Sequence, residues 1–200
     1  LTAADCLTLQ SCLKAQYYSY AEKLLEGTFI CEIDPSSSFL DTEHFLKYFY
    51  YGGLVYMARR RYQKALECFG QCITIPTDAC SAISLEAYKK AVLVSLLHTG
   101  AAYTVPKYSS PVVRRRCTGM KEYHQIQEHF AACNKGKMAA LLADANVRSA
   151  LIADGNIGLA QSVFASVQSQ AMKNLTSTYI KLSLEDIAQK IGAAGEGGAG

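Results

Sequence analysis

The sequence predicts a mainly α-helical fold, an array of antiparallel tetratricopeptide-like hairpins. Half of the 200 residues are hydrophobic, and they recur at the i, i+3, i+4, i+7 spacing of amphipathic helices. The hairpin pattern is best developed over Leu46–Thr77, where small residues mark the close approach of two helices and large ones fill the space. The residues of this pattern are Phe49, Gly53, Tyr56, Ala65, Phe69, Cys72 and Pro76. One hairpin cannot cover its own apolar faces, so we expect others to stack on it.

The N-terminal stretch predicts a first helix pair over Thr2–Glu26. There Ala21 and Leu25 repeat the Ala-x3-large spacing of the main hairpin. A proline and three serines over Ile33–Ser38 predict a loop, because their side chains compete with helical hydrogen bonding. We expect Asp41 to cap the start of the following helix.

The middle of the chain continues as helices. Ser81–Thr99 is apolar around most of its circumference, which is typical of a helix buried between neighbours, and Gly100 ends it. Pro106 precedes or opens a short helix that ends in Arg114–Arg116. Three further apolar stripes predict helices over Lys121–Cys133, over Lys137–Asp154, and from Ile157 to Val167 beyond the break at Gly155-Asn156.

The pattern changes near the C-terminus. Residues Thr176–Leu182 are rich in β-branched and aromatic side chains and predict a short strand. A helix is expected from Ser183, with Glu185 and Asp186 at the positive end of its dipole. A strand followed by a short helix is typical of the opening of a winged helix, which a glycine-rich tail here leaves truncated. We therefore predict tetratricopeptide-like repeats over 1–80, a helical bundle over 81–173 and the start of a winged helix over 174–200.

Composition argues against several classes of function. The formal net charge of +3 does not require nucleic acid or an anionic membrane as partner. The longest apolar run, Ala91–Leu97, is broken by Ser95 and is shorter than the roughly 20 residues of a membrane span. The eight cysteines lack the spacing of a disulfide framework or zinc knuckle, and we interpret them as reduced, packed thiols. His124 and His129 are five residues apart, whereas a helical metal pair needs four. We predict no catalytic residue, metal or cofactor.

Two surface features admit more than one interpretation. The triplets Arg59–Arg61 and Arg114–Arg116 are interpreted as solvated helix ends that compensate helix dipoles, or alternatively as contacts for acidic patches on partners. The tyrosines at 48, 50, 51 and 56 are interpreted as packing between hairpins, with a peptide-binding groove as the alternative.

The segment Tyr179–Ala188, following a helical array, resembles the PCI domain family of the proteasome lid, the COP-nine signalosome and a translation initiation factor complex. Four blocks resemble, more narrowly, the signalosome subunit-three branch of that family: Tyr50–Gly53, Leu85–Lys90, Leu93–Leu96 and Pro106–Ser109. The resemblance implies a non-catalytic scaffold subunit of a complex that regulates cullin-RING ubiquitin ligases by removing a ubiquitin-like modifier. A scaffold subunit of the proteasome lid, or a helical-repeat peptide-binding module, is the alternative.

The resemblance also implies partners and a site. The partners would be other PCI-domain subunits, with no small-molecule substrate and no membrane, in the cytoplasm and nucleus. The winged-helix part carries much of the contact between subunits in this family. The residues that this implies as partner-binding are Tyr179, Leu182, Ser183, Leu184 and Ile187.

Overall fold

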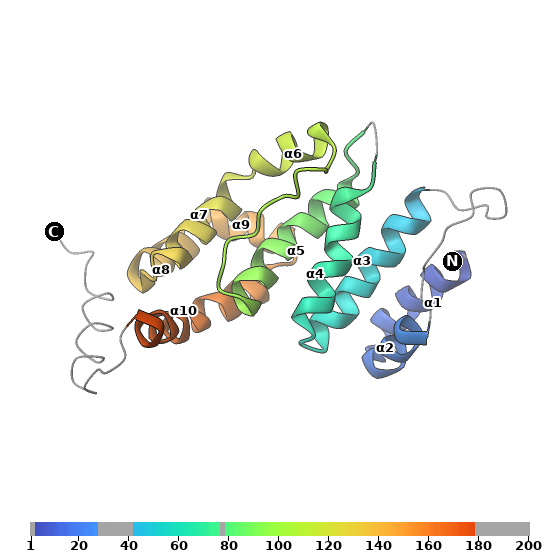
Figure 1. Ribbon diagram of the computed structural model, residues 1–200, viewed down its shortest axis with the longest axis horizontal. Helices are drawn as coiled ribbons and strands as arrows, with labels where there is room; N and C mark the ends of the chain where they lie inside the picture. The colour runs from blue at the N-terminus through green and yellow to red at the C-terminus, as the bar shows by residue number, and fades with distance from the viewer. Residues whose placement is uncertain (1–2, 28–41, 77–78, 179–200) are drawn as a thin grey trace. The chain divides into compact units, whose positions relative to one another are not determined.

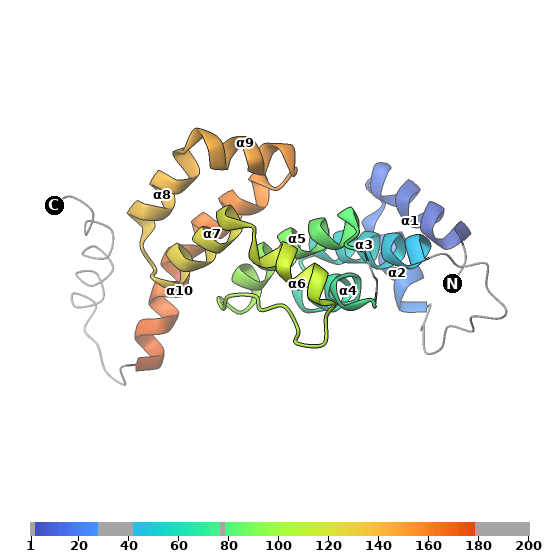
Figure 2. The same cartoon turned by 90° about the horizontal axis from the view of Figure 1, so that it is seen from above.

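The computed structural model describes residues 3–27, 42–76 and 79–178, and every regular element in these ranges is a helix (Figures 1 and 2). The prediction of a mainly α fold is confirmed for the described residues. The helices are α1 (Ala3–Lys14), α2 (Tyr18–Gly27), α3 (Thr42–Ala58), α4 (Tyr62–Thr74), α5 (Ala82–His98), α6 (Pro111–Thr118), α7 (Lys121–Ala131), α8 (Lys135–Ala143), α9 (Ala145–Ala153) and α10 (Ile157–Thr178).

The chain divides into two compact units. Unit 1 comprises Leu1–Val94 and Thr104–Cys117, and unit 2 comprises Ser95–Tyr103 and Thr118–Gly200. Each unit has its own buried apolar residues, among them Phe69 in unit 1 and Phe130 in unit 2. None of the helices in the described ranges has the length and apolarity that crossing a bilayer demands.

The predicted hairpin of unit 1 is formed by α3 and α4, which pack against each other. Gly53 of α3 faces the ring of Phe69 in α4, and a Cβ atom at position 53 would lie 2.7 Å from Cδ1 of that ring. Ala65 and Phe69 are fully buried. The missing side chain at Gly53 thus makes room for the phenyl ring, as the small-large spacing of the sequence predicts.

The expected first helix pair is also confirmed. Helices α1 and α2 contact each other and both contact α3. Leu9 of α1 and Ala21 of α2 are buried, and Leu25 packs against Gly52 of α3, where a Cβ would lie 3.3 Å from Leu25 Cδ2. The two hairpins therefore stack as tetratricopeptide-like repeats do.

The long helix predicted after residue 80 is α5. A continuous run from Ala91 to Val94 is fully buried, in agreement with a helix that is apolar nearly all round. Ser81 precedes its first turn and accepts a hydrogen bond from the Ile83 amide at 3.2 Å. Gly100 follows its end with φ +74°, a conformation that favours glycine.

The prediction of one helix over Lys137–Asp154 is wrong. The structure has two helices, α8 and α9, because Asp144 leaves the helical conformation (φ −60°, ψ 125°). Its carboxylate accepts a hydrogen bond from the Asn146 amide at 2.8 Å and so caps α9. Asn134 caps α8 in the same way, by accepting from the Lys137 amide at 3.0 Å.

The predicted strand over Thr176–Leu182 is wrong for its first three residues, since α10 continues to Thr178. A helix already propagating along this segment outweighs the weak strand preference of β-branched residues. The other C-terminal expectations, the strand from Tyr179 and the helix from Ser183, lie outside the described residues, as do the predicted loop at Ile33–Ser38 and the cap at Asp41.

Candidate protein-interaction site

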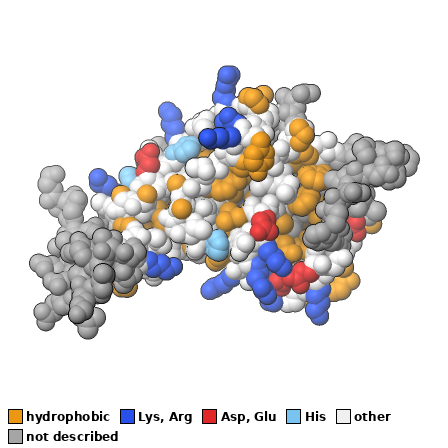
Figure 3. All heavy atoms as spheres, in the orientation of Figure 1, with side chains coloured by type: hydrophobic (Ala, Val, Ile, Leu, Met, Phe, Trp, Pro, Cys, Tyr) orange, Lys and Arg blue, Asp and Glu red, His pale blue; other side chains and the backbone are white. Residues whose placement is uncertain are grey.

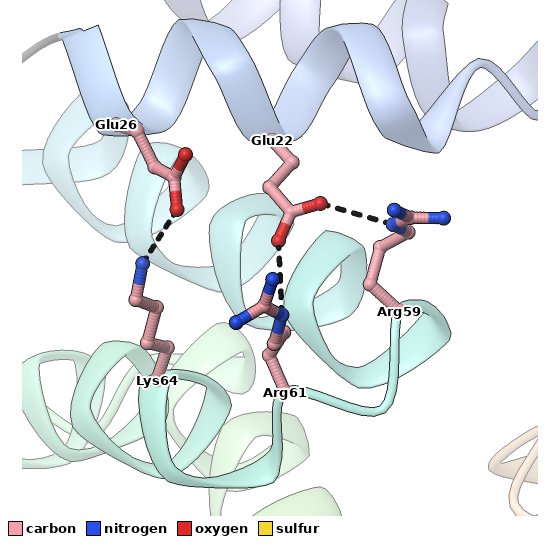
Figure 4. Close-up of polar contacts among 5 residues, drawn as sticks. All are labelled: Glu22, Glu26, Arg59, Arg61 and Lys64. Atoms are coloured by element: carbon pink, nitrogen blue, oxygen red, sulfur yellow. Dashed lines mark hydrogen bonds and ion pairs between the residues drawn. The ribbon is translucent and has the colours of Figure 1, made fainter.

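A cluster of ion pairs joins α2 to the α3–α4 hairpin in unit 1 (Figure 4). Glu22 of α2 lies between two arginines of the α3–α4 turn. Arg59 Nε is 2.9 Å from Glu22 Oε2, and Arg61 Nε is 3.4 Å from Glu22 Oε1. One helical turn further along α2, Glu26 Oε1 is 2.6 Å from Lys64 Nζ of α4. The cluster thus joins α2 to the α3–α4 turn and to α4.

The two carboxylates differ in their surroundings. The Glu22 side chain is only 8% exposed and lies beside two guanidinium groups. Glu26 is open to solvent, and the hydrogen bond from Lys64, together with the charge of that lysine, lowers the pKa of the Glu26 carboxyl. Lys64 Nζ also lies 5.3 Å from the ring centroid of Tyr56.

These contacts revise the interpretation of the first arginine triplet. Arg59 and Arg61 pair with an acid of the same chain, which the solvated-end and partner-patch interpretations both missed. The signal in the sequence is the i, i+4 spacing of Glu22 and Glu26, which puts two acids on one face of α2. In the second triplet, Arg114 donates hydrogen bonds to the carbonyl oxygens of Lys107 and Ser109.

A groove of about 510 Å³ lies beside the ion-pair cluster. Leu25 and Glu26 of α2 form one wall, Phe49 and Tyr56 of α3 another, and residues of α4 complete it. Apolar rings and stems combined with charged rims suit contact with another polypeptide. This ion-pair groove is therefore the candidate site for recognition of a protein segment.

The tyrosines singled out from the sequence have separate roles. Tyr48 is buried, and its ring meets Phe49 edge-on at 5.4 Å. Tyr50 makes tilted ring contacts with Tyr51 and Phe69, whose ring centroids are 6.1 and 6.2 Å away. Among the four, Tyr56 lines the ion-pair groove, although it is largely buried. Packing inside unit 1 therefore accounts for most of their surface.

The groove offers little nucleophilic chemistry. Burial raises the pKa of the Cys68 thiol to about 12 and that of the Tyr56 hydroxyl to about 12, so both stay protonated near neutral pH. Among the described residues, no three histidine, cysteine or acidic side chains are grouped as a metal ion would require. The described cysteines are free thiols.

The partner-binding residues that the family resemblance implies belong to the C-terminal end of the chain. Tyr179, Leu182, Ser183, Leu184 and Ile187 all lie outside the described residues.

Comparison with known proteins identifies the family to which these hairpins belong. Residues 1–113 match the family model described as COP9 signalosome complex subunit 3, N-terminal helical repeats. The chain belongs to the COP9 signalosome complex subunit 3 family. The match covers α1 to α5 and reaches the first residues of α6, so it includes the ion-pair groove. The narrower resemblance drawn from the sequence, to subunit three of the signalosome, is confirmed.

Two curated relatives, both named COP9 signalosome complex subunit 3, support the assignment. The protein of Drosophila melanogaster is 36% identical over 151 residues, which are 76% of this chain and 34% of that relative. The protein of Dictyostelium discoideum is 34% identical over 185 residues, 92% of this chain and 43% of the relative. The chain thus spans between a third and a half of the length of these members of the signalosome family.

Proposed function

We propose that this chain is the helical part of a non-catalytic scaffold subunit of the COP9 signalosome, through which the complex regulates cullin-RING ubiquitin ligases by deneddylation. The proposal rests on one observation: the residues that match the family are those that form the stacked hairpins. Residues 1–113 match the repeats of subunit 3, and α1 to α4 are locked together by apolar packing and ion pairs. A fixed helical surface of this kind holds partners in place.

The partners in this proposal are other PCI-domain subunits of the complex, met in the cytoplasm and nucleus. In the same proposal, residues 81–173 form the helical bundle of a PCI domain and residues 174–200 open its winged helix. The partner-binding residues would then be Tyr179, Leu182, Ser183, Leu184 and Ile187, as the family resemblance implies.

A pull-down of the tagged full-length protein from cell extract tests this function. We expect the other signalosome subunits to co-purify in comparable amounts, and depletion of the protein to increase the neddylated fraction of cullins. A tagged protein that runs as a monomer in size-exclusion chromatography would contradict the proposal. Co-purification of proteasome-lid subunits instead would favour the alternative scaffold.

The ion-pair groove favours one further candidate, a peptide-binding module that acts outside the complex. Its combination of aromatic rings and charged rims is found in many peptide-recognition grooves. A peptide array probed with the full-length protein distinguishes the two functions. One short motif that binds tightly to the isolated protein, and is lost in a Tyr56→Ala variant, would support the peptide-binding module.

A further inference from the structure

The C-terminal end of α6 places arginines directly before an exposed hydroxyl group. The residues there are Arg114, Arg115, Arg116, Cys117 and Thr118, and Thr118 is the last residue of the helix. Arg115, Arg116 and Thr118 are exposed, and Figure 3 shows basic side chains gathered on the surface in the region of α6. We call these five residues the α6 basic segment. The family match ends at residue 113, so it assigns no role to this segment.

The sequence around Thr118 is unlike that around any other hydroxyl residue of the chain. Thr118 is the only serine or threonine in the sequence with an arginine at the second or the third place before it, and it has both. Ser149 is the nearest comparison, because it is also exposed and follows an arginine, but only by one place. Charges at fixed places beside a hydroxyl are what protein kinases use to discriminate between substrates.

The arginines of the α6 basic segment differ in what they contact. Arg114 donates hydrogen bonds to the carbonyl oxygens of Lys107 and Ser109, in the segment before α6. Arg115 lies on the same side of the helix as Thr118, because residues three places apart are neighbours on a helix surface. The guanidinium groups of Arg115 and Arg116 are on the exposed part of the helix, where each could pair with a carboxylate of another protein through two parallel hydrogen bonds.

A kinase takes its acceptor segment in an extended form, so the last turn of α6 has to open. The helix has only 8 residues and Gly119 follows it, so few helical hydrogen bonds hold this end. The side chain of Cys117, which is fully buried, opposes the opening. Local opening of a helix end costs far less free energy than unfolding of the whole domain. The folded protein should therefore be a slower substrate than a free peptide, but still a substrate.

We propose that Thr118 is a phosphorylation site for an ATP-dependent protein kinase that selects basic substrates. Oγ1 of Thr118 attacks the γ-phosphorus of ATP and forms a new O–P bond. The bond from that phosphorus to the β,γ-bridging oxygen breaks, ADP leaves, and the hydroxyl proton passes to a carboxylate of the kinase. Arg115 and Arg116 direct the kinase to this hydroxyl by pairing with acidic side chains of its substrate groove.

The modification would change the charge of this end of α6. A phosphothreonine carries a charge of about −1.5 to −2 at neutral pH, close to the negative end of the helix dipole. Arg115, one turn before it, is within reach as a partner on the same helix face. Phosphorylation would thus cancel most of the positive charge of the α6 basic segment. The inference does not depend on the scaffold function, since the kinase would recognise residues at this end of α6 alone.

Phosphorylation of the purified full-length protein tests the proposal. The probe is the catalytic subunit of cyclic-AMP-dependent protein kinase with magnesium and ATP, because this enzyme selects arginines at these two places. The phosphate is located by mass spectrometry after chymotrypsin digestion, since trypsin cuts next to the site. We expect one phosphate, on Thr118, and none on this segment in a Thr118→Val variant.

Arginine variants test whether the basic residues select the site. Arg115→Ala should lower kcat/KM about tenfold, the size expected for loss of one charge-assisted hydrogen bond. The matched control is Arg60→Ala, which removes an exposed arginine of the other triplet and should leave kcat/KM unaltered. The melting temperature of each variant is measured in parallel, so that a lower rate is not confused with a change in folding.

Three results would overturn the proposal. The first is a phosphate placed on Ser149 in preference to Thr118, and the second is a rate that does not respond to Arg115→Ala. The third is modification of a synthetic peptide of residues 111–122 without any modification of the folded protein. The same digestion is applied to the full-length protein isolated from cells in the presence of phosphatase inhibitors. Phosphate on Thr118 there supports the proposal, and its absence from a fully covered peptide counts against it.

Discussion

The α3–α4 hairpin of unit 1 and helices α7 to α10 of unit 2 both bury apolar side chains, but each also contains a contact of a different kind. In the hairpin, a glycine accommodates a phenylalanine ring, and the ring is fully buried. In unit 2, polar side chains act at the helix ends. Tyr123 of α7 donates to the Asp154 carboxylate at 2.8 Å, and its hydroxyl accepts from the buried amide of Asn156 at 2.8 Å.

This difference has a consequence for how each region responds to change. A core of closely packed apolar side chains is destabilised when the volume of a side chain changes or when a charge forms inside the core. A polar network is sensitive to the loss of a single donor or acceptor, even when the shape is kept. The close contact at Gly53 and the hydrogen-bond network of Tyr123 should therefore fail under different perturbations.

Alkaline pH should give the largest effect and should act on unit 1. Burial, with a smaller contribution from the nearby Cys80, raises the pKa of the Cys117 thiol from the ordinary 9.0 to about 12. The unfolded chain releases this proton first, so stability is full below pH 9.0 and is lost as the pH rises toward about 12. We expect Cys117 to contribute about 2–3 kcal/mol to the loss of stability at about pH 11, measured by urea unfolding in the presence of reductant as the difference between this protein and a variant without the thiol.

A Cys117→Ala variant is the control for this titration. Its free energy of unfolding should fall less steeply between these pH values, since one ionising group is gone. An unchanged slope would show that Cys117 does not contribute.

A methyl group added at Gly53 tests the fit in the hairpin. Gly53→Ala forces Phe69 to move, and overpacking of this kind costs about 1–3 kcal/mol. Gly70→Ala in α4 is the matched control, because a Cβ there would meet no atom within 4 Å. The control should gain up to about 1 kcal/mol from the better helix propensity of alanine. Equal melting temperatures for the two variants would refute the role of Gly53.

The polar network of unit 2 is tested by Tyr123→Phe. The ring stays, while Asp154 loses a donor and Asn156 an acceptor, so we expect a loss of about 1–2 kcal/mol. Thermal unfolding followed by circular dichroism measures it. Tyr108→Phe removes the same hydroxyl from an exposed ring and should change stability by less than about 0.5 kcal/mol. A Tyr123→Phe variant as stable as this control would speak against the network.

The smallest effect is expected at the break between α8 and α9. Asp144→Ala removes the cap of α9 and should cost about 1 kcal/mol. Asp144→Asn keeps an oxygen that can accept from the Asn146 amide, and should retain most of the stability. If alanine and asparagine behave alike in chemical denaturation, the cap is not what separates the two helices.

The sequence predicted the hairpin of unit 1 more accurately than the helices of unit 2. The spacing of Gly53, Ala65 and Phe69 predicted the hairpin, because close helix packing permits few combinations of large and small residues. The sequence did not predict the helix break at Asp144. The apolar stripe continues across this residue, and one acid that could cap a helix is a weak signal by itself. The strand expected from Thr176 failed at its start for a related reason, as local β preference is weak beside a helix that is already formed.

The sequence by itself determined the helical class, the stacked repeats and the family, because these follow from short-range patterns of side-chain size and polarity. Only the tertiary structure decides which charged side chains and helix ends lie next to each other. Glu22 and Arg59 are 37 residues apart in sequence, and the starts of α3, α5 and α6 come together only when the hairpins have folded. Coulomb interactions and helix dipoles depend on distance in space, which no periodicity along the chain records.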